Sequence, residues 1–206
     1  MKTIALSLMG LLTVASMAGT LVDSRDGKNY RTVEIASQEW MAENLNYSQD
    51  SAEGVCYQDK PENCAKYGRL YTWDMAMKAC PEGWRLPQKE EIEELLKVVG
   101  GKQDSKEWWK WYSAGIILKS TEGWKNGFGR IGNGKDSLNF SAMPAGNYIS
   151  GDKEFVDEGF VADFWSSTEN GADEAFSLNL DFISTPAYVR NEGKWLGFSV
   201  RCVKNK

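Results

Sequence analysis

The chain of 206 residues contains no histidine. This absence excludes the Ser-His and Cys-His nucleophile pairs, and it excludes every zinc, copper or haem site that needs an imidazole ligand. The common general base of hydrolases is missing for the same reason. Most familiar hydrolytic chemistries are therefore not expected.

Long apolar runs are scarce as well. The one clear run, Ile4 to Ala15, is too short to cross a bilayer, which takes roughly 20 apolar residues. It follows Lys2 and precedes Ser16-Met17-Ala18, a small-residue cleavage pattern, so we expect residues 1–18 to be a secretory signal peptide and residues 19–206 to be one exported domain. No cysteine ends this leader, so a lipid anchor is not expected and the product should be secreted, periplasmic or at the cell surface. No membrane span should remain after cleavage.

Basic residues are too few for a nucleic-acid partner, since 24 Lys and Arg face 29 Asp and Glu and give a formal charge of −5. In contrast, nine tryptophans are present, and so many indoles are costly to leave in water. The composition predicts a folded, aromatic-rich protein.

Four cysteines are present without any Cys-x-x-Cys pair, which argues against a zinc site. In an exported chain they predict two disulfides with three possible connectivities. Spacing favours a local Cys56–Cys64 loop around Pro61, which leaves Cys80 to pair with Cys202.

The pattern of apolar residues predicts an α+β domain. A hairpin and a polar loop over residues 49–66 come first, and two helices follow. Residues 103–160 are irregular, with one helix expected over residues 105–117, and an antiparallel meander ends the chain. The expected hairpin runs are 29–35 and 39–45, the two helices 73–79 and 89–99, and the terminal strands 162–167, 175–182, 188–191 and 196–203. The acids of the second helix, Glu90, Glu91, Glu93 and Glu94, are expected to form a solvated face.

Several short segments in a fixed order resemble one known family. They are Asp26-Gly27-Lys28-Asn29-Tyr30, Trp40-Met41-Ala42-Glu43-Asn44-Leu45, Gly68-Arg69-Leu70-Tyr71-Thr72-Trp73, Trp84-Arg85-Leu86-Pro87, Phe140 to Gly146, Phe164-Trp165-Ser166-Ser167-Thr168-Glu169 and Gly197 to Val203. Together they are similar to the Fibrobacter succinogenes major paralogous domain family over residues 23–203. The resemblance implies a C-type-lectin-like fold, with two helices packed on a small antiparallel sheet and a long loop region. It also gives a reason for Cys80 to bond Cys202, because in that fold the end of the first helix packs against the last strand.

The resemblance does not imply a known activity. The Glu-Pro-Asn and Trp-Asn-Asp motifs of calcium-dependent lectins are absent, and all four cysteines are expected to form structural disulfides, unlike the reactive cysteines of formylglycine-generating enzymes. We therefore expect a non-catalytic binding module for glycan or protein at the bacterial cell surface or on an extracellular substrate. The alternative is a structural protein for surface assembly.

Candidate ligand-binding residues are aromatic side chains that packing does not claim, and we expect them between Trp108 and Asp163. They are Trp109, Trp124, Phe128, Tyr148 and Phe155. Trp84 to Pro87 and Trp165 are interpreted as packing residues instead.

Five acids near this region could supply oxygen ligands to calcium, but their spacing matches no calcium loop; they are Asp152, Glu154, Asp157, Glu158 and Asp163. A glycosidase pair would need Asp163 together with Glu169 or Asp181, and the sequence does not place two carboxyl groups at the required separation. No metal, cofactor or catalytic residue is expected, and the expected partners are an extracellular glycan or an envelope protein.

Overall fold

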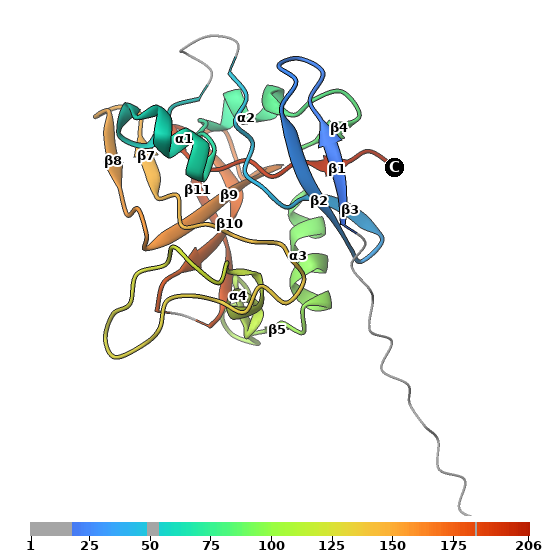
Figure 1. Ribbon diagram of the computed structural model, residues 1–206. Helices are drawn as coiled ribbons and strands as arrows, with labels where there is room; N and C mark the ends of the chain where they lie inside the picture. The colour runs from blue at the N-terminus through green and yellow to red at the C-terminus, as the bar shows by residue number, and fades with distance from the viewer. Residues whose placement is uncertain (1–17, 49–53, 184) are drawn as a thin grey trace, which may run out of the picture.

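A computed structural model describes residues 18–48, 54–183 and 185–206, and Figure 1 shows the arrangement of its elements. The expected signal peptide lies outside the described residues, except for Ala18. The described part is an α+β domain in which strand predominates, as three antiparallel sheets with helices around them. No helix within it is long and apolar enough to cross a membrane.

The first sheet joins the two ends of the described chain. Its strand order is β1-β2-β3-β13-β4, with β1 at Ala18–Val22, β2 at Asn29–Ile35, β3 at Gln38–Met41, β13 at Val203–Lys204 and β4 at Trp84–Arg85. The predicted hairpin is confirmed, and its turn residues Ala36 and Ser37 both have positive φ, as a tight two-residue turn requires. Its second strand ends at Met41 rather than at residue 45. From Met41 onward the backbone bonds the C-terminal segment instead: Met41 N–H donates to the Cys202 carbonyl, Leu45 N–H donates to the Val200 carbonyl, and the Met41 carbonyl accepts from Arg201.

The second sheet contains most of the predicted meander. Its order is β5-β6-β11-β10-β9, with β5 at Lys102–Gln103, β6 at Lys110–Tyr112, β11 at Ala187–Gly193, β10 at Glu174–Asp181 and β9 at Val161–Glu169. The fourth predicted strand, 196–203, is instead divided between two sheets. Its start, β12 (Leu196–Gly197), joins β7 (Asn147–Ile149) and β8 (Glu154–Val156) in the third sheet, and its end is β13.

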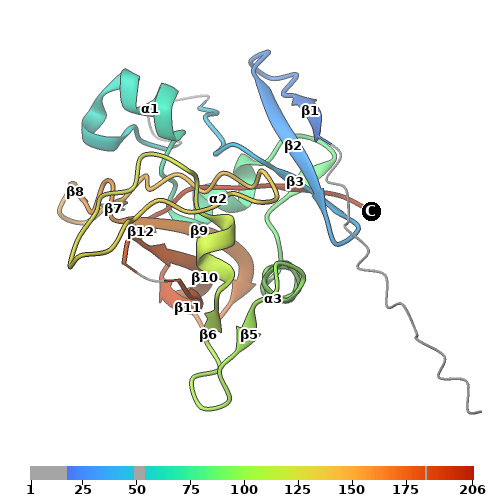
Figure 2. The same cartoon turned by 60° about the horizontal axis from the view of Figure 1, so that its bottom comes forward.

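Both predicted helices are confirmed, as α2 (Trp73–Ala79) and α3 (Lys89–Val98). Helix α3 buries Ile92, Leu95 and Leu96 and begins with a capping box between Gln88 and Glu91. Figure 2 shows α3 end-on beside the second sheet, where these apolar residues pack.

A third helix, α1 (Pro61–Tyr67), occupies part of the segment predicted to be a loop. Its starting signals, Pro61 at the first turn followed by Glu62, fit a helix N-terminus, but the helix is only seven residues long. A 3₁₀ turn, Tyr57–Asp59, precedes it. Unlike α2, which has the same length, α1 lies in a polar segment without an apolar face at helical spacing, so the sequence does not reveal it.

The prediction of a helix over residues 105–117 is wrong. The Asp104 carboxylate accepts the backbone N–H groups of Lys106 and Glu107, which forms a turn between β5 and β6. Along β6 the side chains alternate, with Trp111 buried and Tyr112 exposed, and only then does the short helix α4 (Ala114–Leu118) begin. Trp108, Trp111 and Tyr112 fit helical spacing, but the strand period decides their burial.

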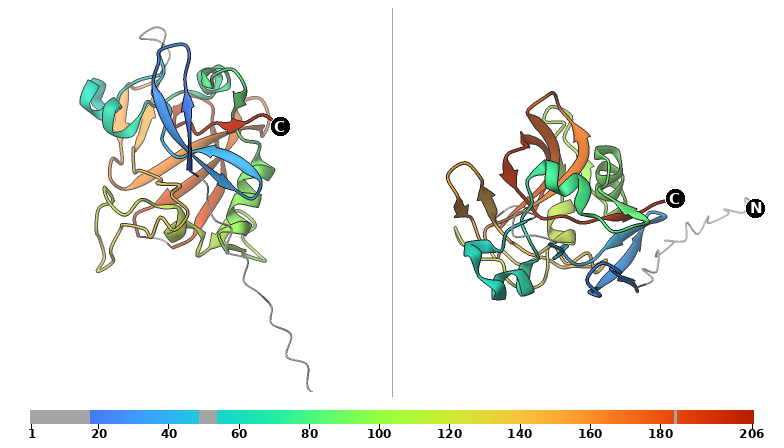
Figure 3. Two further views of the ribbon diagram at one scale, coloured as in Figure 1. Left: turned by 45° about the vertical axis from the view of Figure 1, so that its right-hand side comes forward. Right: turned by 90° about the horizontal axis from the view of Figure 1, so that it is seen from above.

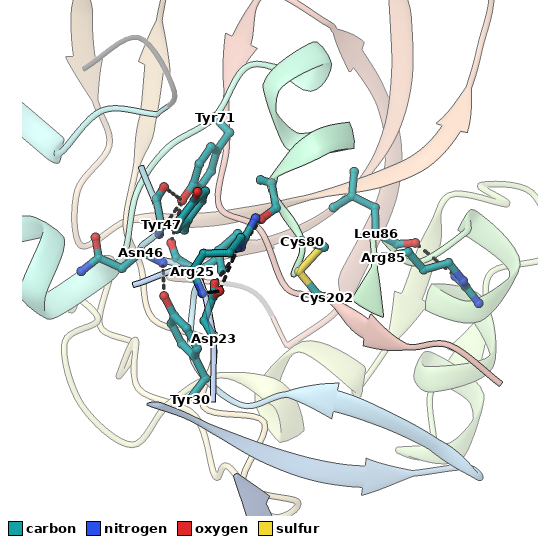
Figure 4. Close-up of a disulfide and its surroundings, with 12 residues drawn as sticks. Asp23, Arg25, Tyr30, Asn46, Tyr47, Tyr71, Cys80, Arg85, Leu86 and Cys202 are labelled. Carbon is teal, nitrogen blue, oxygen red and sulfur yellow. Dashed lines mark hydrogen bonds and ion pairs between the residues drawn. A yellow bond between two sulfur atoms is a disulfide. The ribbon is translucent and has the colours of Figure 1, made fainter. Parts of the chain in front are cut away.

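Two disulfides fix this arrangement, and both are those predicted. Cys56 bonds Cys64, and Cys80, directly after α2, bonds Cys202 just before β13. Figure 4 shows the second bond, with Leu86 nearby and the Arg25–Asp23 ion pair beside Tyr47. The packing interpretation of Trp165 and Leu86 is confirmed, since both are buried, whereas Trp84 is half-buried.

Candidate functional site

A polar cleft of about 670 Å³ lies between the first sheet, α1 and the loop that follows α4. Its walls come from the start of β2 and the segment after β3, from the C-terminal half of α1, and from residues 120–123, 136, 141 and 143. Figures 2 and 3 show α1 and the hairpin flanking the same end of the molecule. Residues far apart in sequence thus share one concave surface.

Arg201 forms the floor of the cleft and is 2% exposed. Its Nε donates to Asn44 Oδ1 at 2.7 Å, its Nη1 to the Met41 and Phe140 carbonyls, and its Nη2 to the Ser141 carbonyl at 2.8 Å. These four bonds use four of the five guanidinium N–H groups. The second hydrogen of Nη2 therefore remains for a partner beyond these four.

Every acceptor of Arg201 is neutral, and no carboxylate among the described residues forms an ion pair with it. Burial lowers the pKa of Arg201 to about 9, and the nearest opposing influences are Asp136 and Glu43. At neutral pH the guanidinium remains charged. The floor thus carries a positive charge that protein carboxylates do not pair directly.

Asn44 connects the floor to the α1 wall. Its Nδ2 donates to the Tyr67 carbonyl at 2.8 Å and to Ser199 Oγ at 3.1 Å, while its Oδ1 accepts from Arg201. Gly68, with φ of 74°, approaches so closely that a Cβ there would lie 2.7 Å from Asn44 Cβ. The end of α1 is therefore held directly against the floor.

Further contacts fix α1 from its outer side. The Cys56–Cys64 bond ties the helix to the preceding 3₁₀ turn, and the Tyr67 hydroxyl donates to Glu158 Oε1 at 2.6 Å. Burial, followed by this bond to the carboxylate, raises the pKa of Tyr67. Tyr67 therefore stays protonated and keeps donating at neutral pH.

Hydrogen-bond donors and acceptors, with charges of both signs, surround the opening of the cleft. Arg31 pairs with Glu43 at 3.3 Å, and Asp136 accepts both the backbone N–H and the hydroxyl of Ser141 at 2.6 Å. The ammonium of Lys66 lies 4.5 Å from the centre of the Tyr67 ring, and none of the described carboxylates lies within ion-pair distance of it. The opening can thus both donate and accept hydrogen bonds.

None of the five aromatic candidates lines this cleft. Trp124 is 5% exposed, and its Nε1 donates to Ser120 Oγ and to the Ala142 carbonyl, so the expectation that it lies on a ligand surface is wrong. Tyr148 and Phe155 are half-buried and pack on each other at 4.8 Å, and Phe155 also packs on Tyr57. They form a packing cluster on β7 and β8.

The other two candidates are accessible to solvent. Trp109 is half-buried, and its ring stands at 86° to that of Trp108. Phe128 is 87% exposed at the tip of the loop after α4. The cleft does use parts of the region predicted for binding, namely residues 120–123, 136, 141 and 143.

Asp163 is a buried residue of β9, and its carboxylate bonds two asparagine side chains, one on β10 and one on β7. Its two carboxylate oxygens accept the side-chain N–H groups of Asn179 and Asn147, each at 2.8 Å. Burial raises the pKa of Asp163 to about 6. Across the described ranges, no group of three or more Asp, Glu, Cys or His residues is arranged to hold a metal ion.

Sequence reasoning missed Arg201, Asn44 and Tyr67 as site residues. A signal was present for two of them, because Asn44 and Arg201 are polar residues inside largely apolar family segments. Both line the cleft, together with Glu43.

Comparison with protein families gives one result, and it fits the motifs. The model of the Fibrobacter succinogenes major domain matches residues 33–204, so the chain belongs to that family. No curated protein sequence and no solved structure matches the chain.

Proposed function

We propose that this member of the Fibrobacter succinogenes major domain family is an exported, non-catalytic binding module that holds a glycan in the cleft above Arg201. The single observation that carries the proposal is the buried guanidinium at the floor, with one N–H beyond its four protein bonds. A buried cation with spare donor capacity favours an oxygen-rich ligand. Its place is the bacterial cell surface or an extracellular substrate.

The chemistry of the opening favours a sugar over an apolar ligand. Sugar hydroxyl groups donate and accept hydrogen bonds, and the cleft offers donors such as Lys66 and acceptors such as Glu43 on one surface. The scaffold beneath is fixed by two disulfides, which limits the ordering cost of binding. If the binding module recognises a protein rather than a glycan, the alternative occupant of the cleft is a protein loop with exposed carbonyl groups.

Two further features belong to the same proposal. Export is supported by the leader-like residues 1–18 and by the two disulfides, which persist in oxidising compartments. A C-type-lectin-like fold is supported by two helices beside antiparallel sheets and by a terminal strand that closes against the N-terminal hairpin.

The edge of the second sheet favours a second candidate function, structural assembly in the envelope. Trp108 is 45% exposed and Tyr112 42% exposed at β5 and β6. Because the neighbouring rings of Trp108 and Trp109 are nearly perpendicular, they do not form the coplanar platform on which sugars stack. Such an edge suits a protein neighbour instead.

The test is a screen of the exported form, residues 19–206, against immobilised glycans and soluble polysaccharides, with and without added calcium. Binding should occur without calcium. It should be lost in Ala65→Trp, because Ala65 is an exposed residue of α1 on the cleft wall and an indole there occupies the opening.

Ala172→Trp provides the matched control, since Ala172 is exposed in the turn after β9 and does not line the cleft. It should bind like the unmodified protein. Equal binding by both variants would place the ligand elsewhere, and retention of envelope proteins without any glycan binding, lost in Trp108→Ser, would favour the assembly function.

A further inference from the structure

The two most exposed large apolar side chains of the described residues lie three positions apart in one loop. Phe128 is 87% exposed and Ile131 is 78% exposed, whereas the other large apolar residues on the surface reach at most 60%. This loop follows α4 in Figure 1 and extends along the lower edge of the molecule. We call residues 123–135 the apolar tip loop.

The tip is a tight hairpin. Gly127 and Arg130 pair through both of their backbone hydrogen bonds, at 3.2 and 2.9 Å, which leaves Phe128 and Gly129 at the apex. Both apex residues have positive φ, 50° and 72°. This geometry matches a two-residue turn that favours Asn, Asp and Gly, so an exposed phenylalanine at the first apex position is unusual.

The root of the loop is held firmly beneath the apex. Side-chain oxygens of Asn126 and Asn133 accept the backbone N–H groups of Gly132 and Trp124. At Gly127 and Gly132 the chain runs so close to Phe182 and to the Lys125 carbonyl that a Cβ would collide with them. The loop thus presents its apex on a well-bonded base, and the ring of Phe128 stands 6.4 Å from that of Phe182, centroid to centroid.

The charges of this loop have one sign. Residues 123–135 contain Lys125, Arg130 and Lys135 and no acidic residue, in a chain whose net charge is −5. Lys125 lies over the Phe160 ring, and Arg130 bonds the Ile183 carbonyl at 3.0 Å, so both cations stand beside the apolar residues. The arrangement is an exposed apolar pair in a loop whose own charged residues are all basic, with the acids Glu122 and Asp136 just outside its two ends.

We infer that the apolar tip loop docks the protein on an anionic lipid surface, with Phe128 and Ile131 entering the acyl region and the three cations meeting lipid phosphates. An exposed apolar pair lacks the area that a stable protein interface buries, but it suits insertion between lipid headgroups. Each basic residue near an anionic leaflet adds to the attraction, and the attraction is screened by salt. This docking is independent of the glycan cleft.

The test is co-sedimentation of the exported form with vesicles of phosphatidylcholine containing about 30% phosphatidylglycerol, compared with phosphatidylcholine alone. We expect binding to the anionic vesicles to fall at least roughly 10-fold when both apolar residues are replaced, as in Phe128→Asn/Ile131→Thr. It should fall similarly in Lys125→Gln/Arg130→Gln/Lys135→Gln and at about 0.5 M salt. Asparagine suits positive φ, so the first variant should keep its melting temperature.

Matched controls use exposed residues elsewhere on the protein. Trp195→Ser removes one exposed ring, and Lys78→Gln/Lys97→Gln/Lys106→Gln removes three exposed cations, and neither should change binding. Failure to bind anionic vesicles, equal binding to neutral ones, or unchanged binding by the tip variants would overturn the inference. So would a dimer that the Phe128→Asn/Ile131→Thr change dissociates, because the tip would then be a self-association surface.

Discussion

Two buried charged side chains, Arg201 and Asp163, form hydrogen bonds with neutral groups rather than direct ion pairs. Arg201 donates to three backbone carbonyls and an amide oxygen, and Asp163 accepts from two asparagine side chains. Burying an ion this way costs free energy, which its hydrogen bonds offset only in part. Substitutions at these two positions should therefore reveal different roles.

At Arg201, the conservative change should be costly. Arg201→Lys keeps the charge, but a single ammonium cannot reach acceptors arranged around a planar guanidinium, so buried carbonyl groups lose their donors. We expect the free energy of unfolding to fall by about 2 kcal/mol or more, measured by guanidinium denaturation. Arg190→Lys, an exposed control, should change it by less than about 0.5 kcal/mol. Equal effects would mean that the floor is not fixed by these bonds.

At Asp163, the effect should depend on pH. The pKa is about 6 in the folded protein against an ordinary value of 3.8, so between these values the folded state holds a proton that the unfolded state has released. The cost of the buried charge is therefore complete above about pH 6 and vanishes as pH falls below about 4. Relative to the unmodified protein, Asp163→Asn should gain about 3 kcal/mol between pH 4 and pH 7, from roughly two pKa units. Chemical denaturation across this range measures the gain, and a difference independent of pH would contradict it.

Residue roles could be predicted where hydrophobic pattern decides them. Trp165, in an expected strand, and Leu86, before Pro87, are both interpreted as packing residues from the sequence, and both are buried. Trp124 could not be assigned correctly, because an indole in an irregular segment has no period to show whether it faces the core. Arg201 was missed because its acceptors at residues 41, 44, 140 and 141 meet only in the folded chain.

Among the elements, those with a clear apolar pattern were predictable, including the seven-residue α2, and those without one were not. Helix α3 has buried positions at 92, 95 and 96, and β9 and β10 are runs of nine and eight residues with mostly buried centres. The segment 105–117 misled because its aromatic residues fit either period. Helix α1 depends on its disulfide and on contacts with Glu158 and Asn44, none of which a local pattern displays.

Because α1 depends on these few contacts, we expect it to unfold locally while the rest of the fold stays intact. Removing its bond by Cys56→Ala/Cys64→Ala should lower the free energy of unfolding by about 2 to 3 kcal/mol, as expected for closing a short loop. Hydrogen exchange should then lose protection at residues 61–68 while β9 and β10 keep theirs. Because α1 forms one cleft wall, glycan affinity should also fall. Unchanged protection at α1 would show that its other contacts suffice.

The whole molecule is closed by pairings between distant segments. The chain after β11 joins the third sheet at β12, bridges to Tyr71 and Phe164, and ends in the first sheet at β13. The sequence predicted a strand there and the family resemblance supported the Cys80–Cys202 bond, but a single strand signal cannot show that three sheets share it. Sheet partners over such separations depend on the whole fold.

Loss of the long-range disulfide should therefore affect the entire protein. Cys80→Ala/Cys202→Ala opens a loop with a sequence separation of 122, for which the chain-entropy model gives about 4 to 5 kcal/mol. We expect a lower melting temperature in all regions together, and a smaller yield of exported protein. Calorimetry compared with the Cys56→Ala/Cys64→Ala variant provides the measurement. A larger loss in the local variant would contradict this account of the closure.

The most direct test of the central claim, that the cleft above Arg201 is the ligand site, is backbone amide NMR during titration with an oligosaccharide from the glycan screen. The cleft predicts that the largest shift changes occur at Asn44, Lys66, Gly68 and Ser141, with saturation at one shared affinity. Changes confined to residues 108–112, or spread without saturation, would contradict the claim and place recognition at the aromatic edge of the second sheet.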